Sequence, residues 1–388
     1  MPPTIVADNL LAWLGTALCI AATGYACCSL WAGIASRRRS EHPQADVNAR
    51  PGRPTSVLKP LHGAEPGLYE DLRGYCEQDY PAYELLFGVR DPEDPAIAIV
   101  QRLQREFPRR LITLVIDTRV HGANLKVSNL INLVEHASHD LLVLADSDIR
   151  VPTDYLAQVT APLAEHDTGI VTCLYHGIAR GNLWSRLGCL FIDDWFAPSV
   201  RLTHAFGSSR FAFGSTIALR RETLDAIGGL EALRDTLADD FWIGELSRAR
   251  GLRTVLSPLV VGTRVNEGEM HSLWTHELRW LRTIRAISPL GFAMTFVCFT
   301  WPVLLLGVAL APSTLNALLA IAGCSARILR YGVSWRDTAR PSPWRDIWLT
   351  PFRDGLLLLE WAGALVRWRV HWRGQVLHAR KHAPTRPP

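Results

Sequence analysis

An uncharged apolar stretch near the N-terminus predicts a transmembrane helix. Residues 10–34 carry no charged side chain, and a stretch of this length is enough to cross the hydrocarbon core of a bilayer. Arg37, Arg38 and Arg39 follow directly, whereas no basic residue precedes the stretch. A cleaved signal peptide has the opposite polarity, so we expect a permanent anchor over residues 1–36, with the N-terminus outside and the next domain in the cytoplasm.

The C-terminal quarter of the chain repeats the apolar pattern. Residues 289–312 and 313–333 predict two transmembrane helices, which together occupy residues 288–333. Arg327 and Arg330 lie in the second stretch, and we expect their long side chains to extend to the headgroup region.

A third apolar stretch interrupted by charges follows. It contains Arg353, Asp354 and Glu360, so a simple transmembrane span is not expected. Residues 345–388 therefore predict a re-entrant or interfacial helix pair followed by a basic cytoplasmic tail.

Between the anchors, residues 53–270 have the pattern of a water-soluble α/β domain. Short apolar runs alternate with helical patterns, which indicates a Rossmann-like, mainly parallel sheet covered by helices on both faces. Ligands of such sheets bind beyond the carboxyl ends of the strands. The runs that predict strands are 55–61, 83–89, 111–116, 140–145 and 169–174, and residues 96–107 predict a helix.

Composition narrows the function classes. The chain has 41 Lys and Arg against 37 Asp and Glu, a balance that does not fit a nucleic-acid-binding protein. With 48% hydrophobic and 20% charged residues, general disorder is excluded. None of the eight cysteines forms a Cys-x-x-Cys pair, so we expect buried apolar thiols in a reducing compartment.

Carboxylates follow two of the predicted strands. Asp91 comes shortly after the run 83–89, and Asp146 and Asp148 follow the run 140–145. Two carboxylates at i and i+2 can face one Mg²⁺ or Mn²⁺ ion, which would stabilise a departing diphosphate. The alternative is that they are solvated acids of a turn.

Two more acids, Asp239 and Asp240, open an amphipathic helix. Acids at a helix N-terminus are stabilised by the helix dipole, so plain capping is one interpretation. The other is a general base that takes the proton of an attacking hydroxyl group.

Residues 271–287 predict an amphipathic helix before the first C-terminal span. A membrane-surface helix with Trp and Arg at headgroup level is one interpretation. In the other, Arg279 meets a diphosphate and Trp280 lines the acceptor end. The two interpretations are compatible.

Taken in order, these residues resemble the D, DxD, D, (Q/R)xxRW pattern of ceramide-glucosyltransferase-like enzymes, glycosyltransferase family 21. The resemblance implies a GT-A fold, a UDP-sugar donor, a divalent cation, a membrane lipid acceptor and inversion at the anomeric carbon. The matching residues are Asp91, Asp146-Ser-Asp148, Asp240 and His276-x-x-Arg279-Trp280.

By position in this pattern, each site residue has an implied role. Asp240 is the base, Asp146 and Asp148 bind the metal and diphosphate, and Arg279 and Trp280 complete the catalytic set. His276 stands where the family has Gln or Arg, so it is either a ligand of the donor or a simple polar helix residue. The other residues implied to bind the donor are Lys59, Gly63, Asp91, Asn124 and Lys126, of which Lys126 could also be a surface lysine.

Within the family, the segments HGANLKVSNLIN and LFIDDWFAPS resemble the bacterial hopanoid-biosynthesis-associated glycosyltransferases. That resemblance implies transfer of N-acetylglucosamine to bacteriohopanetetrol at the bacterial inner membrane, with the catalytic domain in the cytoplasm. Asp193 and Asp194 could meet acceptor hydroxyls or form the polar edge of an interfacial helix. The alternatives are ceramide glucosylation with UDP-glucose, a processive polysaccharide synthase, and an inactive membrane scaffold.

Overall fold

The computed structural model describes residues 3–41, 52–338, 340–342, 344–366, 369–372 and 375–378. Contacts divide these residues into two compact units. We call residues 52–175 and 208–264 the sheet unit, and residues 3–38, 176–207 and 265–378 the helical unit. The sequence pattern places residues 176–207 inside the soluble domain, but they pack with the helical unit.

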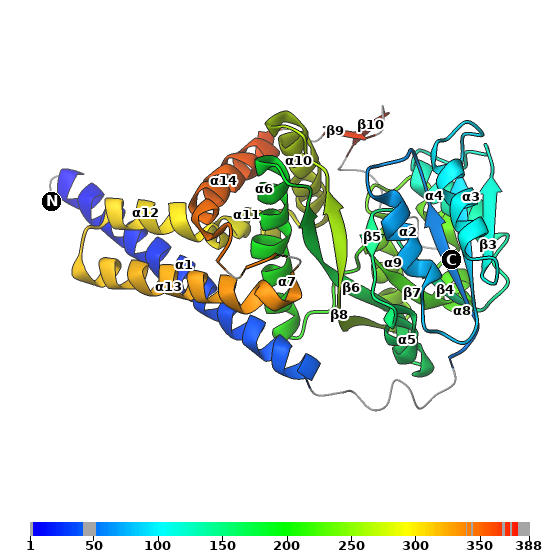
Figure 1. The fold of residues 1–388 in the computed structure, drawn as a ribbon. Coiled ribbons are helices and arrows are strands. Elements are labelled where there is room, and N and C mark those ends of the chain that lie inside the picture. Colours follow the sequence, from blue (N-terminus) through cyan, green and yellow to red (C-terminus); the bar gives the residue numbers. More distant parts are fainter. Residues whose placement is uncertain are drawn as a thin grey trace. The chain divides into compact units, whose positions relative to one another are not determined.

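A mixed eight-stranded sheet forms the sheet unit (Figure 1), with strand order β3-β2-β1-β4-β7-β6-β8-β5. Strands β3, β2, β1 and β4 are parallel, whereas β7 pairs antiparallel with β4 and with β6. The strands are β1 (Thr55–Pro60), β2 (Tyr83–Val89), β3 (Leu111–Ile116), β4 (Leu141–Leu144), β5 (Ile149–Arg150), β6 (Thr168–Ala179), β7 (Ile217–Arg220) and β8 (Arg253–Val265).

Helices cover both faces of this sheet because its central strands are apolar on both sides. In β1, Val57 packs into one hydrophobic core and Leu58 into the other, as the two-residue period of a strand requires. Helices α2 (Leu68–Cys76), α3 (Ala96–Glu106) and α5 (Tyr155–Thr160) supply the first core, and α4 (Leu125–Val134), α8 (Arg221–Ala226) and α9 (Asp239–Ala249) supply the second. The five predicted strands and the helix predicted over 96–107 are confirmed.

The helical unit contains the apolar segments. Its long helices are α1 (Pro3–Glu41), α10 (Met270–Ile287), α13 (Thr314–Ser334) and α14 (Thr350–Val366). Shorter helices are α6 (Leu183–Phe191), the π-helix η2 (Ile192–Phe196), α7 (Ala197–Ala205), α11 (Pro289–Met294) and α12 (Thr300–Leu310), and β9 (Arg369–Trp372) pairs antiparallel with β10 (Gln375–His378).

Among the described residues, two helices are long and apolar enough to cross a membrane, 9–38 and 314–337. The stretch 289–310 is not one straight span, because its two helical parts are bent by 75° at Phe299. The proline ring of Pro302 explains the break, since it would clash with the carbonyl of Cys298 in a continuous helix. Counted as one broken span, this pair gives three.

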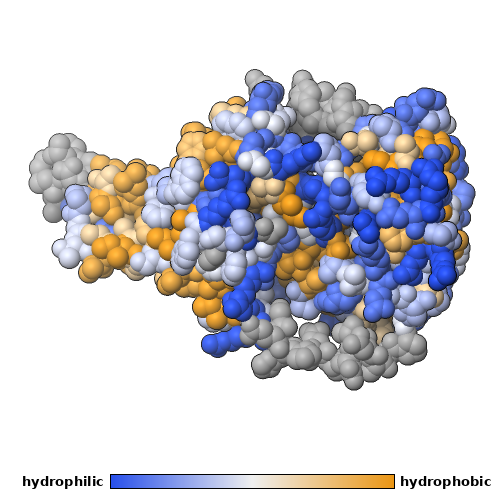
Figure 2. All heavy atoms as spheres, in the orientation of Figure 1, coloured by the Kyte–Doolittle hydropathy of each residue, from blue (hydrophilic) through white to orange (hydrophobic). Residues whose placement is uncertain are grey.

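Exposed apolar side chains gather on three of these helices. Figure 2 shows the apolar surface over α1, α12 and α13. A surface of this kind is typical of contact with lipid. The large side chains include Leu10, Trp13 and Ile20 of α1, Leu305 and Leu306 of α12, and Leu315, Leu318 and Ile321 of α13.

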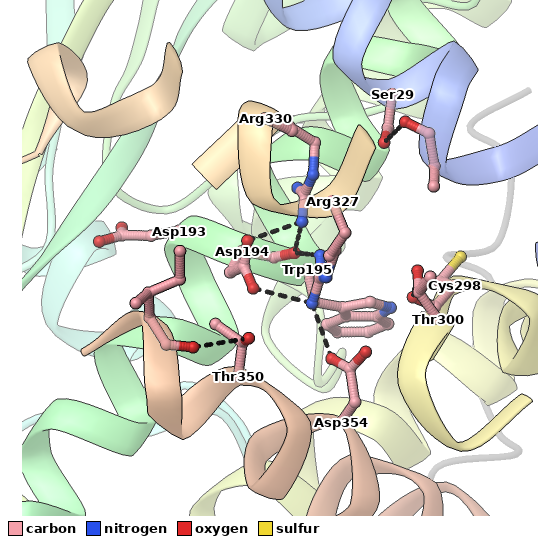
Figure 3. A network of polar contacts seen from close by, with 12 residues as sticks. Ser29, Asp193, Asp194, Trp195, Cys298, Thr300, Arg327, Arg330, Thr350 and Asp354 are labelled. Carbon is pink, nitrogen blue, oxygen red and sulfur yellow. Dashed lines mark hydrogen bonds and ion pairs between the residues drawn. The ribbon is translucent and has the colours of Figure 1, made fainter. Parts of the chain in front are cut away.

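The prediction that Arg327 and Arg330 extend to the headgroups is wrong. Their side chains are 2% and 1% exposed, and they point into the helical unit (Figure 3). Arg327 Nη2 lies 2.8 Å from Asp194 Oδ2 and 2.7 Å from Asp354 Oδ1, and Arg330 Nη2 lies 2.6 Å from Asp194 Oδ1. Paired charges are tolerated in an apolar interior where single ones are not. Asp193 points away from this network (Figure 3).

The charges of α14 are also paired inside the protein. Asp354 additionally accepts a hydrogen bond from the Trp301 amide at the start of α12. Arg353 Nη2 lies 2.6 Å from a carboxylate oxygen of both Glu277 and Glu360. Instead of the predicted helix pair, the structure has one 17-residue helix after a short 3-10 turn. Most of the predicted basic tail, 379–388, lies outside the described residues.

Candidate active site

The carboxyl ends of β1, β2 and β4 meet at one edge of the sheet, because these strands are parallel neighbours. The chain continues from this edge into the segments that carry Gly63, Asp91 and Asp146. The sheet therefore brings three of the predicted site segments to one edge.

Asp146 is held at this edge from three directions. Its carboxylate Oδ1 lies 2.7 Å from Lys126 Nζ, and its carbonyl oxygen accepts a hydrogen bond of 2.7 Å from Lys59 Nζ. Its amide donates to the carbonyl of Gly214 at 3.0 Å. Lys59 is fully buried, so it supports Asp146 from inside the sheet. Burial lowers the pKa of Lys59 to about 7, against the opposing charges of nearby acids.

Asp148 is fixed by the strand β8. Its Oδ2 accepts a hydrogen bond of 2.7 Å from the Thr263 hydroxyl. Burial and then the charge of Asp146 raise the pKa of Asp148 to about 6. The second cause means that the two carboxylates repel each other, a repulsion that a bound cation would relieve.

Asp240 lies at the N-terminus of α9 and is tied to the same site. Its Oδ2 accepts a hydrogen bond of 2.9 Å from the Gly214 amide. Burial and the neighbouring charge of Asp239 raise the pKa of Asp240 to about 6, although Lys126 opposes the shift. At neutral pH this carboxylate is ionised and able to accept a proton.

Gly214 joins the two acids, a role that no sequence motif predicted. Its carbonyl binds the Asp146 amide and its own amide binds the Asp240 carboxylate. A Cβ atom at this position would lie 2.6 Å from Asp146 Oδ2, which is closer than contact allows. The sequence offers one faint signal, a glycine between an apolar run and the next strand.

Lys126 bridges the acids of the site. Its Nζ also lies 3.1 Å from Asp239 Oδ2. Burial acts to lower the pKa of Lys126, but the charges of Asp146, Asp239 and Asp240 raise it overall, so the ammonium stays charged. The interpretation of Lys126 as an exposed surface lysine is therefore wrong, since its side chain is 19% exposed and paired.

Asn124 has a local role that the pattern did not predict. Its side-chain oxygen caps α4 by accepting from the amides of Lys126 and Val127. Its amide nitrogen donates to the Thr236 carbonyl and to Asp239 Oδ1, at 2.8 and 3.2 Å. Asn124 thus fixes the helix that carries Lys126 against the segment that carries the acids.

Gly63 and Asp91 lie on neighbouring loops of the same edge. The Gly63 amide donates to both carboxylate oxygens of buried Asp94, and Gly63 has a φ of 73°, a conformation that favours glycine. Asp91 is exposed, and its Oδ1 accepts from the Glu93 amide. Within the described residues, no hydrogen bond or ion pair joins Asp91 to Asp146, so a shared donor site for these two is a prediction.

The remaining motif lies on α10, in the helical unit. Here His276 Nδ1 lies 2.7 Å from Glu267 Oε1, and the His276 ring packs edge-on against Trp280 with centroids 4.9 Å apart. Trp280 in turn lies 5.5 Å from Phe191. His276, Arg279 and Trp280 are all half-buried.

The residues present fit a divalent cation. Among the residues that the structure describes, no group of three or more His, Cys, Asp or Glu side chains could hold a metal ion by itself. Asp146 and Asp148 offer two mutually repelling carboxylates, which leaves coordination positions for diphosphate oxygens and water.

This fold, with carboxylates at the carboxyl edge of a mixed sheet and a separate set of apolar helices, defines a GT-A-type protein with membrane helices. The sequence profile of Glycosyl transferase family 21 matches residues 14–384. The chain belongs to this family, as the residue pattern predicted.

Two curated relatives agree with this assignment. Ceramide glucosyltransferase 3 of Caenorhabditis elegans is 22% identical over 271 residues, covering 66% of this chain and 55% of the relative. Ceramide glucosyltransferase 1 of the same organism is 24% identical over 235 residues, covering 60% and 50%. The chain thus spans about half the length of these curated relatives.

Among solved structures, a mannosyltransferase from Pyrobaculum calidifontis in complex with GDP-Man and Mn²⁺ has a similar fold. The TM-score is 0.53 at 21% identity, covering 92% of this chain and 99% of that one. The likeness confirms the predicted GT-A-type fold.

Proposed function

We propose that the protein is an inverting glycosyltransferase that transfers a sugar from a UDP-sugar to a hydroxyl group of a membrane lipid. The observation that carries the proposal is the linkage of Asp146 to Asp240 through the main chain of Gly214 and the charge of Lys126. An acid on the donor side and an ionised acid able to act as a base are thereby held within one rigid site.

On the donor side, the proposed ligands lie along the carboxyl edge of the sheet. Asp91 and the Gly63 loop would bind the nucleotide, and Lys126 would face the diphosphate. Lys59 and Asn124 are proposed to act indirectly and not to contact the donor. Lys59 holds Asp146, and Asn124 holds the start of the helix that carries Lys126. Asp146 and Asp148 would hold Mg²⁺ or Mn²⁺, which would neutralise charge on the departing diphosphate. The mannosyltransferase bound to Mn²⁺ supports this assignment.

In the transfer step, the lipid hydroxyl oxygen attacks the anomeric carbon from the face opposite the diphosphate. The bond from that carbon to the diphosphate oxygen breaks, and its electron pair leaves with UDP. The proton of the hydroxyl passes to the Asp240 carboxylate. Because the attack comes from the face opposite the leaving group, the configuration at the anomeric carbon is inverted. Arg279 and Trp280 of the α10 motif would contact the diphosphate and the acceptor.

The apolar helices would hold the enzyme at the bilayer, where a lipid acceptor is found. A polycyclic or long-chain lipid is nearly absent from water, so an enzyme that uses it must work at the bilayer. We propose that the site lies at the cytoplasmic face of the membrane, because Arg37, Arg38 and Arg39 at the C-terminal end of α1 follow the positive-inside rule. The proposed membrane is a bacterial inner membrane, from the resemblance to hopanoid-associated enzymes. The acceptor we favour is bacteriohopanetetrol with N-acetylglucosamine as the sugar, from the resemblance of two sequence segments to hopanoid-associated glycosyltransferases.

Ceramide glucosylation with UDP-glucose is the second candidate. The two curated relatives named above are ceramide glucosyltransferases, and this favours it. One experiment separates the two: the membrane-embedded protein is incubated with labelled UDP-sugars and either hopanoid or ceramide lipids, and the product is identified by mass spectrometry.

The proposed base is tested in the same assay. Asp240→Asn should abolish transfer while UDP-sugar binding survives, because the amide cannot accept the proton. Asp225→Asn, on the exposed surface of α8, is the matched control and should transfer normally. Normal turnover in Asp240→Asn would refute its role as the base.

A further inference from the structure

One buried acid beside the α10 motif, Glu267, has no role in the family pattern. It lies between β8 and α10, and 8% of it is exposed. Its Oε1 lies 2.7 Å from His276 Nδ1. Although burial acts in the opposite direction, hydrogen bonds from His276 and Ser272 and the charge of Arg279 lower the pKa of Glu267. The carboxylate is therefore ionised at neutral pH.

An ionised carboxylate determines which nitrogen of His276 carries the hydrogen. Because a carboxylate only accepts hydrogen bonds, Nδ1 must be the donor. In the neutral ring Nε2 then has a lone pair and accepts a hydrogen bond. The contact also stops rotation of the ring, which packs against Trp280.

The side chain and the main chain of Glu267 serve different purposes. Its carbonyl oxygen accepts hydrogen bonds from Asn182 Nδ2 and Ser185 Oγ, at 2.8 and 3.0 Å, and so holds the start of α6. These bonds do not depend on the carboxylate. A change of the side chain alone should therefore leave the local fold in place.

We infer that Glu267 is the positioning residue of His276: it fixes the Nδ1–H tautomer, so that Nε2 accepts a hydrogen bond from a substrate hydroxyl. This inference rests on the proposed function. It also explains how an imidazole serves where members of the family have Gln, since a Gln side chain likewise offers one acceptor oxygen. The hydroxyl belongs either to the sugar of the donor or to the lipid, and the two sources are distinguishable by kinetics.

Glu267→Gln tests this pair with almost no change of shape, because the amide can donate to Nδ1 and release the tautomer. We expect the KM for one hydroxyl-bearing substrate to rise about tenfold, the size of one lost hydrogen bond. A rise for the UDP-sugar identifies the sugar hydroxyl, and a rise for the lipid identifies the acceptor. Inhibition by UDP, which lacks the transferred sugar, should not change.

His276→Ala should raise the same KM by a similar factor, and the double variant should be no worse than either single variant. Glu165→Gln, at an exposed position of the sheet unit, is the control and should behave as wild type. Unchanged KM values in Glu267→Gln, additive effects in the double variant, or weaker UDP inhibition would each overturn the inference.

A measurement without turnover separates this inference from the proposed function. In ¹⁵N spectra of labelled histidine, the signal lost in His276→Ala should show the hydrogen on Nδ1. A hydrogen on Nε2 would overturn the inference even in an active enzyme. A wild-type protein that transfers no sugar would instead refute the proposed function.

Discussion

Gly214→Ala places a methyl group between the acids of the proposed site. The new Cβ would lie 2.6 Å from Asp146 Oδ2 and 3.1 Å from Lys126 Nζ, whereas ordinary contact begins at 3.4 Å. The Asp146 carboxylate must therefore move by about 0.8 Å. Both contacts are to the ends of flexible side chains, so the backbone should stay in place. We expect the melting temperature to fall by less than about 4 °C.

This small displacement should have a large effect on activity. A misplacement of about 1 Å at a reacting group costs about 100-fold in rate, so we expect kcat/KM for the UDP-sugar to fall by about that factor. The assay is the initial rate of label transfer from UDP-sugar to lipid in nanodiscs, beside thermal unfolding of the same sample. Gly355→Ala in α14 is the control, because its Cβ meets nothing within 4 Å. Wild-type kcat/KM in a folded Gly214→Ala protein would refute the reasoning.

Three further predictions concern charge. The pKa of Asp240 is raised to about 6, and the base must be ionised to accept a proton. At saturating Mn²⁺, kcat/KM should therefore fall about tenfold per pH unit below pH 6. A flat profile from pH 7 to 5 would count against this base. Lys126→Met leaves the acids unbalanced and should raise the KM for the UDP-sugar at least about tenfold, as measured by initial rates, and an unchanged KM would remove Lys126 from the site. Arg327→Met leaves buried Asp354 without its arginine and Asp194 with Arg330 alone. It should lower the free energy of unfolding by about 3–5 kcal/mol, against about 0.5 kcal/mol or less for the exposed control Arg210→Met, both measured by denaturation in detergent.

The sequence was sufficient to predict the position of site residues where the hydrophobic periodicity and the motif agreed. Strand β4 is a run of four buried apolar residues, so the turn after it and its acids had to lie at the sheet edge. The start of α9 at Asp239 also followed from its amphipathic pattern. Both predictions depend on local features of the chain.

What the sequence could not supply were pairings between distant segments. The role of Gly214 arises from its place between β4 and α9, and a glycine carries no chemical signal of its own. Lys59 matched a donor-binding segment, but β1 is buried on both faces and turns this side chain inward. Arg353 and Asp354 made residues 347–366 look unsuited to an apolar environment. Their partners lie on the distant helices α10 and α13, so the sequence did not reveal that these charges are paired.

The ion pairs of α13 also constrain how the chain enters the membrane. During synthesis Arg327 and Arg330 emerge after Asp194 but before Asp354, so α13 is made while half of its counter-charges do not yet exist. An unpaired arginine within a membrane helix costs up to about 2.5–3.5 kcal/mol on insertion. We therefore expect α13 to remain at the translocon or the bilayer surface until α14 follows, so that the two helices insert together and truncation before Asp354 yields a chain that is degraded.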